Sequence, residues 1–255
     1  MVAAAAGMAS AGKKPFVFTA GAFLAYRCME FIRDDVCFQN LNVKIVGMGS
    51  GLAWSSLGPT HHTTEDISIL RVIPNLMILS PATPKQVAEC VQTAYEHFGP
   101  VYIKIGMNHE KEFFPENYKH SIYKNDILKD GSDVAVFVTG SILEEAVKVC
   151  DMLGREGISV KLINVTTIKP FNTEEVVNVA RDISRIVVIE EHNIHGGLAG
   201  IIAETLMYAG ISAKILPIGL KDNFAEGYGS QQMVRKVNGL DAESIYHQIM
   251  ESNLI

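Results

Sequence analysis

The sequence lacks any concentration of basic residues. Its 255 residues include 22 Lys and Arg against 28 Asp and Glu, which gives a formal net charge of -6, and no stretch gathers Lys and Arg. A protein that binds DNA or RNA normally presents a basic patch to the phosphate backbone. The composition therefore predicts no nucleic-acid partner.

Long hydrophobic runs are also absent. The opening stretch MVAAAAGMASAGKK is apolar but too short to cross a bilayer. It has no basic residue ahead of its apolar part, because Lys13 and Lys14 follow that part, and this order does not fit a secretory signal. We therefore predict a helix of small residues that packs closely on the protein, no membrane span and a cytoplasmic location.

Cysteine is scarce. The four cysteines, at positions 28, 37, 90 and 150, stand singly, with no CxxC pair and no histidine at metal-ligand spacing. Neither a zinc site nor a disulfide framework is indicated. The sequence predicts four reduced, mostly buried thiols and no metal ligands.

Short apolar runs alternate with amphipathic, helix-like segments along the whole chain. The pattern predicts strands near 15–20, 42–49, 76–80, 100–106, 133–140, 158–165, 185–191 and 213–220, and helices near 1–12, 25–37, 67–73, 83–98, 141–155, 173–182, 196–210 and 241–252. Thr83 and Ser141 are expected to cap their helices, the second in a capping box with Glu144. Nearly continuous apolar strands between helices are typical of parallel strands buried on both faces.

This alternation predicts an α/β protein of two three-layer domains with mostly parallel sheets. Residues 107–132 carry no sustained period and are the predicted linker, which divides the chain into domains at 1–118 and 119–255. The first domain begins in mid-element, without an N-terminal strand. We therefore expect it to be abbreviated or to be completed by another chain, since an open sheet edge exposes unpaired backbone.

The stretch LGPTHHTTED at 57–66 places His61 and His62 directly after a Gly-Pro-Thr turn. Taken alone, such a histidine is a ligand, an acid-base group or simply a polar loop residue. Glu65 and Asp66 suit the start of the next helix, where carboxylates interact favourably with the helix dipole.

Three stretches together resemble the transketolase family. They are GMASAGKKPFVFTAGAFL, the long segment from FIRDDVCFQN through LGPTHHTTED to RVIPNLMILSPA, and VVIEEHNIHGGLAG. The resemblance is to the C-terminal part of such proteins, a pyrimidine-binding domain followed by the transketolase C-terminal domain. This part is a separate subunit in split transketolases and the end of deoxyxylulose-phosphate synthase.

The resemblance implies a thiamine diphosphate site shared between two chains. An N-terminal subunit would hold the diphosphate with Mg²⁺ (or Ca²⁺), in a homodimer or heterotetramer, and this chain would hold the aminopyrimidine ring. Phe23 matches the aromatic residue that stacks on that ring, with Tyr26 and Met29 following at helical spacing; Met29 stands where the family often has Tyr.

The resemblance also implies roles for residues that face the sugar substrate. His61 matches the histidine that points at substrate oxygens, where an imidazole can donate a hydrogen bond or move a proton near neutral pH. His62 would support it. Lys104 is the remaining cation for a sugar phosphate, because Gly49, Ser50 and Met107 stand where basic residues are usual in the family. The acceptor is then non-phosphorylated, or its anion is bound by the partner chain.

Two family motifs are missing from these 255 residues. The Gly-Asp-Gly metal motif is absent, and the catalytic glutamate belongs to an Ala-Glu-Gln-Asn stretch that would precede Met1. If Met1 is the start, that carboxylate cannot come from this polypeptide.

Three hypotheses follow. The chain is the C-terminal subunit of a transketolase that moves a two-carbon ketol unit between sugars; or a non-catalytic assembly or regulatory subunit; or half of an enzyme of the synthase or ketoacid dehydrogenase type.

A further motif, EEHNIHGGLAG at 190–200, has acidic residues and histidines near a predicted strand end, but not at zinc spacing. We predict a structural role for it.

Overall fold

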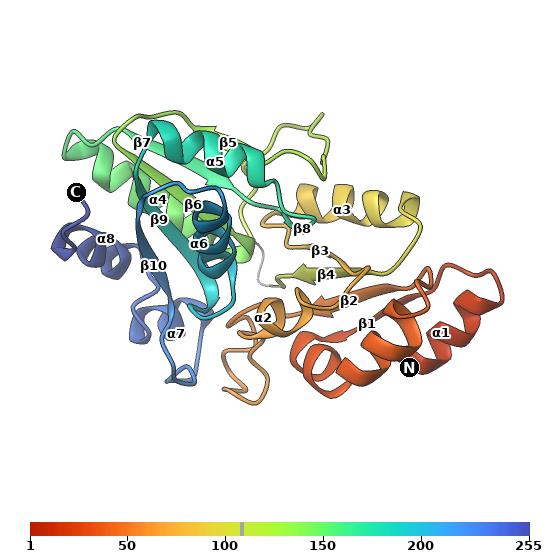
Figure 1. The fold of residues 1–255 in the computed structure, drawn as a ribbon. Helices are drawn as coiled ribbons and strands as arrows, with labels where there is room; N and C mark the ends of the chain where they lie inside the picture. Colours follow the sequence, from red (N-terminus) through yellow and green to blue (C-terminus); the bar gives the residue numbers. More distant parts are fainter. Residues whose placement is uncertain (108–109) are drawn as a thin grey trace.

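The computed structural model describes residues 1–107 and 110–255 and contains two five-stranded sheets (Figure 1). The strand order of the first is β1 (Phe16–Ala20), β2 (Lys44–Met48), β4 (Val101–Ile105), β3 (Met77–Leu79), β8 (Thr167–Lys169). The order of the second is β10 (Lys214–Leu220), β9 (Arg185–Asn193), β6 (Val134–Thr139), β7 (Val160–Asn164), β5 (Asp126–Lys129). In each sheet the first four strands are parallel and the last is antiparallel. The predicted α/β class with two mostly parallel sheets is confirmed.

Helices cover both faces of each sheet (Figure 1). The first sheet lies between α3 (Pro84–Glu96) and a group formed by α1 (Val2–Ser10), two π-helical segments (Phe23–Arg27, Phe31–Cys37) and α2 (Asp66–Leu70). The second lies between the pair α5 (Thr173–Asp182) and α6 (Leu198–Tyr208) and the group α4 (Leu143–Arg155), α7 (Gln231–Val237) and α8 (Ala242–Glu251). Each sheet is thus the middle of three layers.

The two sheets share one hydrophobic core. A single cluster of buried side chains runs from α1 and the π-helical segments, through α2, to α5 and α6. Ile168 of β8 belongs to this cluster, and β8 itself, although it comes late in the chain, pairs with β3 of the first sheet. The domain boundary at 118/119 stays a prediction, but the packing does not separate the chain into independent units.

Local sequence signals predicted the ends and winding of the helices only in part. Thr83 caps α3 as predicted, since its side chain accepts a hydrogen bond from the Gln86 amide. The predicted capping box at Ser141 is wrong: a 3₁₀ turn at Gly140–Ile142 precedes α4, and the Ser141 hydroxyl donates to Glu191 instead. The predicted helix near 25–37 has the wider π-helical winding, which occurs often at functional sites.

Besides the 3₁₀ turn before α4, three elements were not expected from the sequence: β5, β8 and α7. β5 lies within the predicted linker 107–132, so this segment is not wholly irregular; residues 108 and 109 of it lie outside the described residues. The small-residue helix is present as α1, and its Val2, Ala5 and Ala6 are buried. All four cysteines are free thiols, three of them buried, as predicted.

Buried polar side chains also join the two sheets. The Gln86 amide on α3 donates to Asp126 of β5 at 2.8 Å and to Thr166 at 2.9 Å. Tyr118 donates to the same Asp126 oxygen at 3.0 Å. Because such groups are costly to bury without partners, this network favours one relative placement of the sheets.

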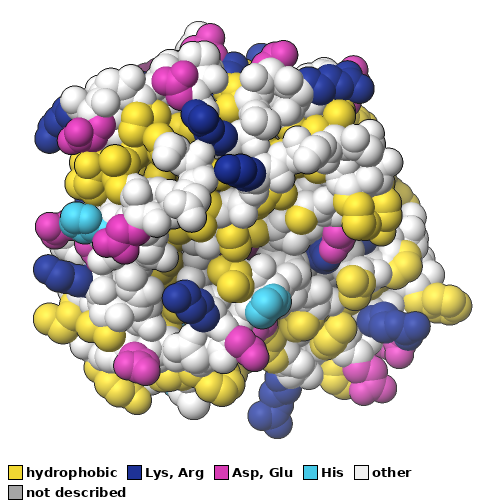
Figure 2. Space-filling view, turned by 60° about the vertical axis from the view of Figure 1, so that its left-hand side comes forward, with side chains coloured by type: hydrophobic (Ala, Val, Ile, Leu, Met, Phe, Trp, Pro, Cys, Tyr) yellow, Lys and Arg dark blue, Asp and Glu magenta, His cyan; other side chains and the backbone are white. Residues whose placement is uncertain are grey.

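The face of the molecule drawn in Figure 2 is mixed in character. Figure 2 shows a face on which basic, acidic and hydrophobic side chains are interspersed. Among the helices of the described residues, none is both long and apolar enough to cross a membrane.

His120 links the segment after β4 to both α3 and β8. Its burial makes the stability of the fold depend on pH. Its Nδ1 lies 3.0 Å from the Thr93 hydroxyl and its Nε2 3.0 Å from the Thr167 hydroxyl. Burial lowers the pKa of His120 to about 4, against a smaller opposing effect of Glu89. The unfolded chain then binds a proton near pH 6.5 that the folded chain does not, so stability is lost as the pH falls from about 6.5 towards 4.

The variant His120→Gln keeps a hydrogen-bonding group but cannot titrate. Between pH 7 and 4.5, we expect its free energy of unfolding to decrease by about 1–2 kcal/mol less than that of the wild type. Urea unfolding at the two pH values measures this difference. His247→Gln, at an exposed position on α8, is the control. Its free energy of unfolding should decrease between pH 7 and 4.5 by as much as that of the wild type. Equal losses in His120→Gln and the wild type would contradict the assignment.

Candidate active site

The candidate site forms where the first sheet's parallel strands end. β1, β2 and β4 are neighbours and run parallel, so the segments that follow them emerge at one edge. Phe23 follows β1, the loop 49–65 follows β2, and Lys104 lies at the end of β4. Residues far apart in the sequence are thereby brought together.

The loop 49–65 is held in shape by close backbone approaches. Gly49 has φ +76°, and a β-carbon there would lie 2.0 Å from Nε1 of Trp54, which covers it. Gly51 has φ +58° and exchanges two backbone hydrogen bonds with Thr63, of 3.2 and 2.9 Å. Both positions need glycine, since left-handed backbone and the lack of space each exclude a side chain.

Phe23 and His61 meet across this edge. Their ring centroids are 5.1 Å apart and their planes make an angle of 77°, an edge-to-face arrangement typical of favourable aromatic contacts. The Phe23 side chain is 46% exposed, and the His61 ring is half-buried, with Nδ1 3.0 Å from the Thr60 hydroxyl. An aromatic ring and an imidazole thus stand side by side at the surface.

Tyr26 and Met29 have different surroundings from Phe23. The Tyr26 hydroxyl donates to Glu65 at 2.6 Å and accepts from the amides of Thr64 and Glu65 at 3.0 and 3.1 Å. Burial and the nearby Asp66 raise the pKa of Tyr26. Met29 packs against the shared core. Tyr26 therefore connects the π-helical segment to the loop by hydrogen bonds, while Met29 packs against the hydrophobic core.

His62 lies behind His61 and is 2% exposed. Within the described part of the chain, neither of its ring nitrogens has a hydrogen-bond partner. Burial lowers the pKa of His62, against the opposing effects of Glu191 and Glu65. A neutral imidazole carries one N–H donor and one acceptor, so His62 keeps an unused hydrogen-bonding capacity beside the loop.

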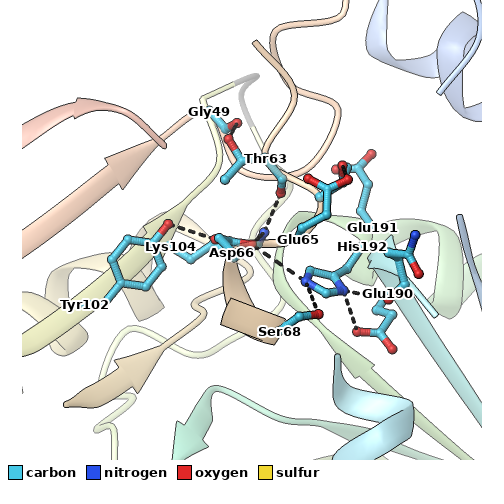
Figure 3. Close-up of polar contacts among 12 residues, drawn as sticks. Gly49, Thr63, Glu65, Asp66, Ser68, Tyr102, Lys104, Glu190, Glu191 and His192 are labelled. Carbon is cyan, nitrogen blue, oxygen red and sulfur yellow. Dashed lines mark hydrogen bonds and ion pairs between the residues drawn. The ribbon is translucent and has the colours of Figure 1, made fainter. Parts of the chain in front are cut away.

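Lys104 lies in a buried polar cluster under the loop (Figure 3). Its Nζ donates to Asp66 at 2.6 Å and to the Thr63 carbonyl at 2.8 Å, and the Tyr102 hydroxyl donates to the other Asp66 oxygen at 2.7 Å. Burial and the Asp66 carboxylate raise the pKa of Tyr102. The structure thus gives the Lys104 ammonium two internal partners, and its role toward substrate stays a prediction.

The end of β9 adjoins the same cluster from the second sheet (Figure 3). Glu190 accepts from the amides of Leu198 and Ala199 at 2.7 and 2.9 Å and so caps α6. The His192 ring lies 4.0 Å from Asp66 through Nε2 and 3.7 Å from Glu190 through Nδ1. These internal contacts agree with the structural role predicted for residues 190–200.

Glu191 connects the two sheets. It accepts from Arg235 Nε at 2.7 Å, from Gln231 at 2.9 Å and from Ser141 at 3.1 Å. On its other side it touches the first domain, since a β-carbon on Gly51 would lie 2.4 Å from its Oε2. The Asn193 amide adds a hydrogen bond of 2.7 Å to the Thr64 carbonyl. The second sheet therefore holds the loop that carries His61.

The described residues contain no group of three or more His, Cys, Asp or Glu side chains arranged to hold a metal ion. What the exposed part of the site offers is a partly exposed aromatic ring, an imidazole and the backbone of a shaped loop.

Sequence reasoning missed Asp66 as the centre of a buried cluster and treated it only as a helix start. One signal was available. Tyr102 and Lys104 alternate along an otherwise apolar strand and so point to the same face. Two buried polar groups on one face require a partner, which Asp66 supplies.

We expect Asp66→Asn to lower the free energy of unfolding by about 3–5 kcal/mol, because it leaves the buried Lys104 ammonium without a counter-charge. Urea unfolding measures this cost. The control Glu89→Gln removes an exposed ion pair to Lys119 and should cost less than about 1 kcal/mol. The double variant Asp66→Asn, Lys104→Met removes both charges and should recover part of the loss. Equal costs for Asp66→Asn and the control would contradict the central place of the pair.

Comparisons with known proteins agree with this geometry. A family model described as the pyrimidine binding domain of transketolase matches residues 1–106, and one described as the transketolase C-terminal domain matches residues 124–245. A subunit of the apulose-4-phosphate transketolase of Actinobacillus succinogenes is 32% identical over 253 residues, which cover 99% of this chain and 81% of that protein. The 1-deoxy-D-xylulose-5-phosphate synthase of Dictyoglomus turgidum is 34% identical over 252 residues, 96% of this chain and 40% of the synthase.

A solved structure is similar along nearly the whole chain. It is described as a split gene transketolase in an inactive beta4 tetramer, with a TM-score of 0.89 and 31% identity over 97% of this chain and 79% of that one. The similarity thus extends over nearly the whole of this chain. On the strength of these matches, the chain belongs to the transketolase family.

Proposed function

We propose that this chain is the C-terminal subunit of a thiamine-diphosphate-dependent transketolase, which transfers a two-carbon ketol unit between sugars or sugar phosphates. An N-terminal subunit would hold the diphosphate and Mg²⁺. The observation that supports this most directly is the contact of Phe23 with His61 at 5.1 Å, because it places a stacking ring and a proton-handling ring side by side.

The exposed ring of Phe23 fits the flat aminopyrimidine of thiamine diphosphate. Nearly half of the Phe23 side chain is exposed, while its edge contact with His61 fixes its orientation. Offset stacking on such a ring is favourable for a flat heterocycle. Tyr26 and Met29 would hold the segment that presents Phe23. When bound, the cofactor supplies the nucleophilic carbon that carries the ketol unit.

His61 would act on the sugar. Its Nδ1 is next to the Thr60 hydroxyl, so Nε2 remains to meet a substrate oxygen, as donor or as proton carrier. His62 would fix the turn from behind. Lys104 already binds Asp66 and Thr63, so binding a phosphate as well would require it to leave a buried ion pair.

The partner subunit is inferred from relatives. The similar chain from Actinobacillus succinogenes is one subunit of its transketolase, and it matches 99% of this chain. No Gly-Asp-Gly motif occurs in these 255 residues, which agrees with a diphosphate and metal site on the proposed N-terminal subunit. The synthase alternative shares the same turn and is distinguished by the substrates that the assembled enzyme accepts.

We expect ketol transfer only when this chain is mixed with an N-terminal subunit, thiamine diphosphate and Mg²⁺. The chain is produced with any in-frame residues that its gene encodes ahead of Met1. His61→Ala should lower kcat by about 10²–10⁴-fold, the usual contribution of a positioned acid-base group. His247→Ala, exposed on α8, is the control and should be fully active. Transfer by this chain alone, or an active His61→Ala mixture, would refute the proposal.

Phe23→Ala should weaken thiamine diphosphate binding about tenfold, because it removes a stacking contact of about 1–1.5 kcal/mol. Isothermal titration of the mixed subunits measures the affinity. Phe98→Ala removes another exposed ring, one that follows α3 away from the loop, and should leave the affinity unchanged. A Phe23→Ala mixture that binds as tightly as the wild type would show that the cofactor does not lie against this ring.

A further inference from the structure

The turn that carries His61 is covered by a residue of the second domain. Gly58 is buried and has φ +78°, and a β-carbon on it would lie 2.4 Å from Cε1 and 3.0 Å from the hydroxyl oxygen of Tyr228. The Tyr228 ring therefore lies directly on the backbone of Gly58. Tyr228 belongs to the segment between β10 and α7, far from the turn in sequence.

Gly58 is connected to His61 by a hydrogen bond. The His61 amide donates to the Gly58 carbonyl at 2.9 Å, and the Leu57 amide donates to the Trp54 carbonyl at 2.9 Å. The position of the Gly58 peptide thus fixes where the His61 backbone begins. The Tyr228 ring contacts Gly58, and Gly58 in turn binds the His61 amide, so the ring can influence the position of the His61 backbone.

The segment that carries Tyr228 is itself held at both ends. Before Tyr228, Glu226 exchanges two hydrogen bonds of 2.9 Å with the Asn238 side chain. After it, the Gly229 carbonyl accepts from the Ser55 hydroxyl at 2.7 Å, and Ser230 caps α7. A fixed segment can transmit position, whereas a loose one could not.

Tyr228 is 65% exposed, and no hydrogen bond of its hydroxyl occurs among the described residues. Its contact with the turn is made by the ring, not by a polar group that the fold requires.

We propose that Tyr228 is a positioning residue for His61: its ring fixes the Gly58 peptide and thereby the direction in which the imidazole points. The second domain thus shapes the catalytic turn without contributing a catalytic residue. This inference rests on the role proposed above for His61. It differs from a direct substrate contact by Tyr228, which would require the hydroxyl.

The first test reads the His61 ring in the isolated chain, without a partner subunit. The ¹H–¹³C NMR signals of His61, assigned with His61→Gln, are compared in wild type, Tyr228→Ala, Tyr228→Phe and Tyr208→Ala. Tyr208 is an exposed tyrosine on α6 and is the matched control. We expect the His61 signals to shift and broaden in Tyr228→Ala alone. Unchanged signals in a folded Tyr228→Ala chain would overturn the proposal.

A second test uses the contact itself. Gly58→Ala introduces a β-carbon that collides with the Tyr228 ring and also strains the left-handed backbone. In the Tyr228→Ala background only the strain remains, so Gly58→Ala should lower the melting temperature less there than in the wild type. Equal decreases in the two backgrounds would show that the ring and the turn are not coupled.

The third test is kinetic and uses the mixed subunits. Tyr228→Ala should lower kcat about tenfold or more, since small misplacements of a catalytic group reduce rates strongly, with thiamine diphosphate affinity unchanged. Tyr228→Phe should restore the rate, whereas a loss as large as that of Tyr228→Ala would make the hydroxyl, and not the ring, responsible. If the wild-type mixture shows no ketol transfer, the proposed function fails, while the NMR and melting measurements still decide the placement of His61 by Tyr228.

Discussion

The end of strand β4 fixes both ends of the functional loop, and the rest of the site depends on this constraint. The Ile105 carbonyl accepts from the Ser50 amide at 2.8 Å, where the loop begins. The neighbouring Lys104 donates to the Thr63 carbonyl at 2.8 Å and to Asp66 at 2.6 Å, where it ends. A buried ammonium with a carboxylate and a carbonyl as its partners cannot exchange them for water without a large desolvation change. The residues between these points, 51–62, can therefore keep a shape that Gly51 and Gly58 allow but that no helix or strand would impose.

The second domain acts on this loop as a support and not as a separate body. Its Glu191 carboxylate lies against Gly51, its Asn193 amide binds the Thr64 carbonyl, and the Tyr228 ring covers Gly58. The shared hydrophobic core and the pairing of β8 with β3 make this support rigid, because moving one sheet would break a strand pair and open buried apolar surface. The C-terminal part of the chain therefore helps to hold the loop that carries His61.

The sequence was sufficient for what depends on local periodicity. The alternation of apolar runs and amphipathic segments predicted both sheets and most helices, and Thr83 with Pro84 predicted the start of α3. It was insufficient where long-range contacts decide. Ser141 has the side chain of a helix cap, but Glu191, fifty residues away, takes its hydroxyl. Likewise β8 is only three residues long and has no pattern of its own; it exists because β3 offers an open edge.

The same distinction between local and long-range information applies to the site. Phe23 and His61 could be named from family resemblance, and the structure places their rings in contact. Tyr228 could not be named at all, since its importance arises from the packing of its ring on the Gly58 backbone, which is a property of the folded chain.

The charges buried near the site bear on how a sugar phosphate would be recognised. Lys104 is paired with Asp66 and Arg235 with Glu191, and each of these side chains is at most 10% exposed. Taking either cation away from its carboxylate would leave an unpaired buried charge, at a cost of about 3–5 kcal/mol. For Lys104 a phosphate contact offsets less than this, because an ammonium cannot form the bidentate hydrogen bonds that a guanidinium forms with phosphate. Under the function proposed above, we therefore expect the acceptor's anion to be bound by groups from the partner chain, or the acceptor to carry no phosphate.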